Sequence, residues 1–172
     1  MAEQDVPVAA DVVTEQDYER FARHRIAEIG GDAEAFGLSY NVLHLAYMMI
    51  TDYEALVHRE KGWTMPGFRL MFKLWVLGPT QPARLADLSG TTRSAMSNLI
   101  NTLEKAGLVE RTRDEKDRRV VFVALTVEGR DAVSGVFPKQ NGREARWFAA
   151  LDGPESTHMV ELIRRVVAAR PD

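Results

Sequence analysis

Hydrophobic positions recur at helical spacing over most of the 172-residue chain. In residues 14–30 they lie three or four apart, Thr14 begins a capping-box pattern and Gly30 ends it, which predicts a short amphipathic helix. Residues 38–60 carry two neighbouring apolar stripes, with Ser39 as the expected N-cap. A helix that is apolar over so wide an arc is expected to pack on its own domain and on a partner chain.

The middle of the chain predicts three helices followed by a β-hairpin. Helices are expected over 65–77, 82–89 and 93–106, because each begins at a capping residue or proline and ends at a glycine. Two segments rich in β-branched residues, 108–112 and 120–126, flank a charged turn and predict paired strands.

The last part of the chain is expected to be helical again. Residues 127–147 have helical spacing, with a kink or break expected near Pro138 and Gly142. Asp152 begins a second capping-box pattern, and a clean helical period follows over 154–168.

These elements predict a mainly α fold with a small β-hairpin, an α+β class built as a winged helix-turn-helix between terminal helices. Residues 1–13 are acidic and without a period, and we expect a disordered tail there. The expected organisation is an N-terminal helical part over 14–62, a winged helix over 63–126 and C-terminal helices over 127–172.

The helix over 93–106 has an unusually polar face. Short polar side chains gather on it, with apolar Met96, Leu99, Ile100 and Leu103 opposite. Such side chains let a helix approach base edges in the DNA major groove, whereas a merely solvated face more often carries Glu, Lys or Gln. The polar face comprises Thr91, Thr92, Arg93, Ser94, Ser97, Asn98 and Asn101.

The turn of the hairpin is strongly basic. Arg111, Arg113, Lys116, Arg118 and Arg119 lie within nine residues, and Asp117 is expected to pair with Arg119. Arginines on such a loop can contact the phosphate backbone or enter a narrow minor groove. A mixed-charge solvated turn is the alternative for the hairpin alone. The ordered combination of polar helix and basic hairpin favours DNA.

The net charge of −3 does not oppose this interpretation, because charge is unevenly placed. Residues 1–60 contain four arginines and no lysine against twelve acidic residues, whereas the rest contains 18 basic and 13 acidic residues. A binding surface needs local positive potential rather than a positive whole.

The stretch from Leu85 to Val133 resembles the winged helix of MarR-type bacterial transcriptional regulators. The resemblance includes the LE–GLVER join between helix and hairpin, the Asp117-Arg118-Arg119 motif and the LT–G step that leads into the next helix. The resemblance extends outward over residues 38–168, about three quarters of the chain, and includes Met65-Pro66-Gly67-Phe68-Arg69 and the last helix. The helix over 14–30 lies outside the family core, although some urate- and phenolic-responsive members have a similar extension.

The resemblance implies a homodimer whose two lobes bind one inverted repeat of double-stranded DNA. Carried over by motif, base-facing residues are Thr92, Arg93, Ser94, Ser97, Asn98 and Asn101, and hairpin residues that contact DNA are Arg113, Asp117, Arg118 and Arg119. Arg119 is the expected minor-groove arginine, with Asp117 orienting it. The absence of cysteine removes the peroxide-sensing branch of the family.

The resemblance also implies a small aromatic effector held between the terminal helices and the lobe. Aromatic walls with one Arg or His suit a planar anion. The candidates are His44, Tyr47, Met48 and Thr51 with Trp63, Arg69, Phe72 and Trp75. The alternative, which we favour on residue type alone, is that these side chains are ordinary core residues.

Other classes of function fit less well. A winged helix can serve only in protein interaction or dimerisation, but that module has no need of both a polar helix face and an arginine-rich hairpin. An enzyme is disfavoured because no nucleotide loop, metal-ligand set or nucleophile motif is recognisable, and no cofactor is expected. The N-terminus lacks the features of a signal peptide and no apolar run is long enough to span a membrane, so a cytoplasmic protein is expected.

Overall fold

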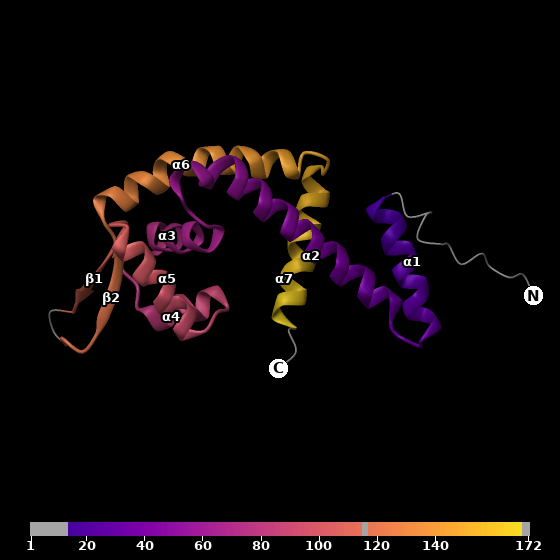
Figure 1. Cartoon of the computed structure of the whole chain (residues 1–172), viewed down its shortest axis with the longest axis horizontal. Coiled ribbons are helices and arrows are strands. Elements are labelled where there is room, and N and C mark those ends of the chain that lie inside the picture. The colour runs from indigo at the N-terminus through magenta and orange to yellow at the C-terminus, as the bar shows by residue number, and fades with distance from the viewer. Residues whose placement is uncertain (1–13, 115–116, 170–172) are drawn as a thin grey trace, which may run out of the picture. The chain divides into compact units, whose positions relative to one another are not determined.

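The computed structural model describes residues 14–114 and 117–169. Within these residues the fold is mainly helical with one antiparallel hairpin, which confirms the predicted fold class (Figure 1). The predicted tail over 1–13 and the turn residues Glu115 and Lys116 lie outside the described residues. The elements are α1 (Glu15–Glu28), α2 (Ala33–Tyr53), α3 (Met65–Leu77), α4 (Pro82–Ser89), α5 (Arg93–Lys105), β1 (Val109–Arg113), β2 (Val121–Leu125), α6 (Val127–Trp147) and α7 (Gly153–Ala168).

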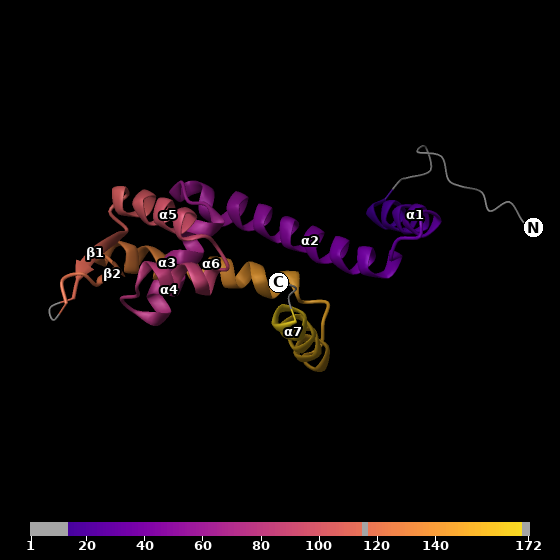
Figure 2. The ribbon, with the colours of Figure 1, turned by 90° about the horizontal axis from the view of Figure 1, so that it is seen from below.

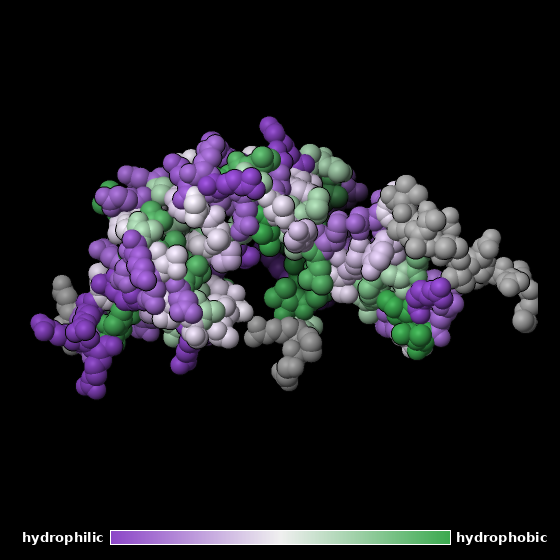
Figure 3. All heavy atoms as spheres, viewed as in Figure 1, coloured by the Kyte–Doolittle hydropathy of each residue, from purple (hydrophilic) through white to green (hydrophobic). Residues whose placement is uncertain are grey.

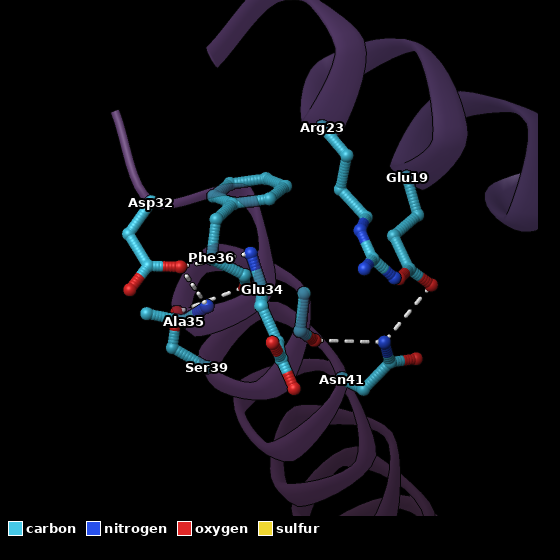
Figure 4. A network of polar contacts seen from close by, with 9 residues as sticks. Glu19, Arg23, Asp32, Glu34, Ala35, Phe36, Ser39 and Asn41 are labelled. Carbon is cyan, nitrogen blue, oxygen red and sulfur yellow. Dashed lines mark hydrogen bonds and ion pairs between the residues drawn. The ribbon is translucent and has the colours of Figure 1, made fainter. Parts of the chain in front are cut away.

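The chain forms two compact units, one up to Thr51 and one from Asp52 onwards. In the first unit, α1 lies against the start of α2 through polar and aromatic contacts. The Asn41 amide donates to Glu19 at 2.9 Å, and the Tyr40 hydroxyl donates to the Glu15 carboxylate (Figure 4 shows the Asn41 contact). The rings of Tyr18 and Tyr40 lie 5.6 Å apart. The hydrogen bond to Glu15 raises the pKa of Tyr40 to about 12.

The second unit has the hydrophobic core of the protein. Helices α3, α4 and α5 gather beside the hairpin and α6, as Figures 1 and 2 show from two directions. Their fully buried side chains include Phe68, Met71, Leu85, Ile100 and Val133. Burying side chains of this size stabilises a fold by about 1.5–3 kcal/mol each, so this core fixes how α5 and the hairpin are held.

The hairpin is anchored to the helical core through its second strand. β1 and β2 pair antiparallel from Val109 opposite Leu125 to Arg113 opposite Val121. Thr80, between α3 and α4, exchanges two backbone hydrogen bonds of 2.9 Å with Val123. The hairpin is therefore tied to the helical core through its second strand.

Most helix termini lie where the capping residues predict them. Thr14 and Asp152 form complete capping boxes, and Thr64 and Thr92 accept backbone hydrogen bonds as N-caps. These caps satisfy backbone N–H groups that have no partner within the helix.

The predicted start of the long second helix is wrong. α2 begins at Ala33, because Asp32 accepts backbone hydrogen bonds from Glu34 and Ala35, and Ser39 lies inside the helix. The end of the helix differs as well. After Tyr53 the chain continues as a π-helical turn, Glu54–His58, and a 3₁₀ turn, Arg59–Lys61.

The expected break in the helix over 127–147 is also wrong. α6 runs without interruption through Pro138 and Gly142. Proline removes one helical hydrogen bond, but Val133, Val136 and Gln140 are buried around it. Packing of this face offsets the local cost of the proline.

Candidate nucleic-acid interface

Local capping residues set where α4 ends and α5 begins. α4 ends at Gly90, whose φ of 59° lies in the left-handed region that glycine adopts without strain. Two residues later the Thr92 hydroxyl accepts from the Ala95 N–H at 3.1 Å and begins α5. The short turn holds the N-terminus of α5, with its unpaired N–H groups, at the surface of the lobe.

The two faces of α5 divide as predicted. Met96, Ile100 and Leu103 are buried, and Leu99 packs on the same core. Every residue of the predicted polar face is exposed, namely Thr91, Thr92, Arg93, Ser94, Ser97, Asn98 and Asn101. The helix thus offers a continuous row of short donors and acceptors while its other side is fixed in the core.

The described part of the hairpin turn is held by aspartates. The Asp117 carboxylate accepts from the Arg119 N–H at 3.0 Å and lies 3.6 Å from the Arg119 guanidinium. Asp114 accepts from the Asp117 N–H at 3.0 Å. The side chain of Arg119 is nevertheless 95% exposed. The expected pairing is confirmed, and it leaves the guanidinium facing solvent.

Hydrophilic residues gather at the hairpin end of the molecule (Figure 3). Arg113 ends β1 and is exposed, and Arg118 and Arg119 are exposed in the turn. These three arginines lie on the same hairpin that packs on α5 through β1, so one compact unit holds both the polar helix face and the arginines.

Sequence reasoning missed a link between these two elements. Arg111 of β1 donates to the Asn101 side-chain oxygen at 2.6 Å and pairs with the Glu104 carboxylate. Both Glu104 and Arg111 lie in the LE–GLVER join, so the sequence contained the signal. Their contact depends on how β1 packs beside α5, which the sequence spacing alone does not give.

A second missed cluster lies within the second unit, where Asp52 contacts α6. Arg143 donates from Nε to Asp52 at 2.9 Å, and the Trp147 indole donates to the same carboxylate at 3.0 Å. The hydrogen bond from Arg143 lowers the pKa of Asp52, and Trp147 adds to that effect. A carboxylate that directly follows a long apolar stretch was the available signal, because a half-buried charge needs a partner.

The π-helical turn buries His58 in the same region. Its Nε2 lies 2.9 Å from the Gln140 side-chain oxygen, and Gln140 in turn donates to Glu144. The centroids of the His58 and Phe68 rings lie 4.6 Å apart. Burial lowers the pKa of His58, which keeps the imidazole neutral in the folded protein.

The candidate effector residues fall in both units. His44, Tyr47, Met48 and Thr51 belong to the first, where His44 stacks on Tyr40 at 5.9 Å and Tyr47 is 67% exposed. In the second, Trp63 and Trp75 are joined through Phe68 and Phe72 by successive ring contacts of 6.4, 6.2 and 5.8 Å. Arg69 is exposed on α3.

The described residues contain neither a metal-ligand group nor a membrane-spanning helix. No group of His, Asp and Glu suited to a metal ion occurs among the residues that the structure describes. None of the described helices is long and apolar enough to cross a membrane.

Comparison with known proteins agrees with the winged-helix fold. Residues 63–121 match the MarR family model. An uncharacterized HTH-type transcriptional regulator, YwaE of Bacillus subtilis, is 29% identical over 133 residues, which cover 77% of this chain and 78% of YwaE.

Two solved structures have the same fold. The MepR–DNA complex of S. aureus has a TM-score of 0.71 and 19% identity, over 77% of this chain and 97% of MepR. The PcaV transcriptional regulator of Streptomyces coelicolor, solved with its natural ligand, has a TM-score of 0.66 and 22% identity, over 77% of this chain and 91% of PcaV. The proteins that this chain resembles are regulators and not enzymes. Residues 63–121 therefore match the MarR family, within a chain that has the winged-helix fold and is similar to HTH-type transcriptional regulators.

Proposed function

We propose that the chain is a homodimeric, sequence-specific repressor that a small aromatic or phenolic ligand releases from its operator. The observation that carries the proposal is the division of α5 into a buried apolar face and an exposed row of short polar side chains, beside a hairpin with exposed arginines. We infer that the protein acts in the cytoplasm, where the chromosome lies.

Within the interface the residues have distinct roles. Thr92, Arg93, Ser94, Ser97, Asn98 and Asn101 face the major groove, where side chains of this length can reach base edges. Arg118 and Arg119 contact the minor groove and its backbone, with Asp117 holding the turn, and Arg113 contacts phosphate. The helix reads sequence, and the hairpin adds affinity.

Exposed apolar faces support the homodimer. On α2, Val42, Leu43 and Tyr47 are more than 60% exposed, and α7 has Val166 and Val167 exposed to a similar degree. Figure 3 shows hydrophobic residues gathered over α7. Monomeric proteins rarely leave contiguous apolar faces in water, so a second copy of the chain covers these helices. The two lobes then bind an inverted repeat with half-site centres about 10 bp apart.

Repression and release follow from this assembly. A dimer on an operator blocks a promoter by occupancy alone, whereas activation requires an additional favourable contact with the polymerase. PcaV, a protein of the same fold, was solved with a ligand. For this chain the proposed ligand residues are His44, Tyr47 and Met48 of the first unit and Trp63, Arg69 and Trp75 of the second, because aromatic rings and the Arg69 guanidinium suit a planar aromatic anion.

Binding to duplex DNA from the region upstream of the protein's own coding sequence tests the proposal. Mobility shifts at two salt concentrations should show a specific complex that scrambled duplex does not compete away, and light scattering should give twice the 19.3 kDa chain mass. Salicylate and related phenolic acids, titrated into the complex, should release the DNA. A 19 kDa monomer, or equal affinity for scrambled duplex, would contradict the proposal and favour a protein-interaction module.

A further inference from the structure

Arg111 joins the hairpin to the polar face of α5. Its guanidinium donates to the Asn101 side-chain oxygen at 2.6 Å and pairs with the Glu104 carboxylate through its other terminal nitrogen. The side chains of Arg111 and Glu104 are 31% and 38% exposed, whereas that of Arg119 is 95% exposed. Arg111 is therefore committed to contacts within the lobe, unlike the arginine of the turn.

This contact fixes the direction of the Asn101 amide. A guanidinium has five N–H donors and no acceptor, so Asn101 must present its oxygen to Arg111. The amide NH₂ group then points away from the hairpin. The positive charge beside the oxygen also repels any second donor that approaches it. Asn101 thus offers hydrogen-bond donors, while one lone pair of its oxygen is taken by Arg111 and the other lies beside that positive charge.

The difference matters for base recognition. An unconstrained asparagine binds adenine through a paired donor and acceptor, at N7 and N6. An asparagine that offers donors alone loses the pairing with adenine N6 and keeps only adenine N7, whereas guanine offers two acceptors, N7 and O6, and thymine offers O4.

We propose that Arg111 is a specificity-determining residue: by holding the Asn101 oxygen, it makes Asn101 select a base with an acceptor edge and disfavour adenine. Arg111 acts through Asn101 and does not itself touch the DNA. The inference rests on the proposed function, because it requires α5 to lie in the major groove.

The test uses the full-length protein and duplexes that it selects from a pool of random sequence. Each base pair of the selected half-site is then changed in turn, and affinity is measured by fluorescence anisotropy. Asn101→Ala identifies the contacted position as the one where discrimination is lost. In the wild type that position should prefer guanine or thymine over adenine by about tenfold, the value of one good side-chain contact to a base.

The decisive variant is Arg111→Met, which keeps the aliphatic stem and removes the donors. At the position assigned to Asn101, the preference over adenine should fall by about fivefold or more, because the freed amide can pair with adenine. Affinity for scrambled duplex should change by less than about twofold. Arg113→Met is the matched control, since Arg113 lies two residues along the same strand and is exposed. It should weaken all duplexes alike and leave the preference unchanged.

Several results would overturn the inference. A uniform loss of affinity in Arg111→Met, with a lower salt dependence, would mean that Arg111 contacts phosphate. Unchanged discrimination at every position in Asn101→Ala would remove Asn101 from base recognition while leaving the proposed function intact. Failure of the wild type to select any common sequence would refute the proposed function itself. If Arg111→Met melts early, Glu104→Gln loosens the same arginine, and the same loss of preference is expected from it.

Discussion

Replacing Gly129 by alanine should disturb the contact that seats the hairpin on α6. Gly129 is buried in the first turn of α6, and a Cβ atom added there would lie 2.0 Å from the backbone oxygen of Leu108 and 3.2 Å from the Leu125 side chain. Backbone cannot rotate out of the way as a flexible side chain can. The start of α6 must therefore move away from the strand.

That movement breaks bonds as well as contacts. The Thr126 hydroxyl donates to the Gly107 oxygen at 2.7 Å, and the Thr126 N–H donates to Leu108 at 3.2 Å. Overpacking of this kind costs about 1–3 kcal/mol, and one lost hydrogen bond adds about 1 kcal/mol. The free energy of unfolding should fall by about 2–4 kcal/mol, and Tm by about 6–12 °C.

The assay is thermal and urea unfolding followed by circular dichroism, at one protein concentration because a dimer's Tm depends on it. Gly135→Ala is the matched control, since Gly135 lies in the same helix and a Cβ there would meet nothing within 4 Å. Alanine should stabilise the helix at that position by about 0.5–1 kcal/mol. A Gly129→Ala variant as stable as the wild type would refute the close packing of α6 on Leu108 and the end of β2.

Two further substitutions, at His58 and at Asp52, have defined outcomes. Burial lowers the pKa of His58, so the unfolded chain takes up a proton that the folded chain does not, and stability should fall as pH drops below about 6.5. The hydrogen bond to Gln140 and the nearby Glu54 carboxylate oppose that trend; His58→Gln should flatten the pH dependence of unfolding, whereas His158→Gln should not. Asp52→Asn should cost about 1–3 kcal/mol of stability in urea unfolding, because the Arg143 guanidinium loses its carboxylate. Asp52→Asn should lose more stability than the control Asp152→Asn, because asparagine at 152 still provides an N-cap acceptor.

Local chemistry made much of the fold predictable. Thr14, Thr64, Thr92 and Asp152 begin helices because each side chain satisfies a backbone N–H, a purely local event. The polar and apolar faces of α5 follow from residue spacing in the same way. The start of α2 was missed because Asp32 and Ser39 are both good caps, and only packing of α1 on α2 distinguishes them.

Features that depend on distant residues could not be predicted. The partner of Asp52 lies 91 residues away in α6, and no spacing rule connects them. The π-helical turn that buries His58 depends on the contact with Gln140, again from α6. Asn101 could be placed on the exposed face of α5, but the direction of its amide depends on Arg111 of the hairpin.

The measurement that tests the central claim most directly compares Asn98→Ala with Arg119→Ala on selected and scrambled duplexes over a range of salt. Asn98 is exposed on α5, so its loss should weaken selected duplex by about 5- to 100-fold and leave scrambled duplex nearly unchanged. Arg119 should act mainly through charge, so its loss should weaken both duplexes by similar factors. The slope of log affinity against log salt concentration should fall by about one for each hairpin of the dimer. Equal weakening of both duplexes by Asn98→Ala would contradict base recognition by this face of α5, and unfolding by Arg119→Ala would make the hairpin arginines structural.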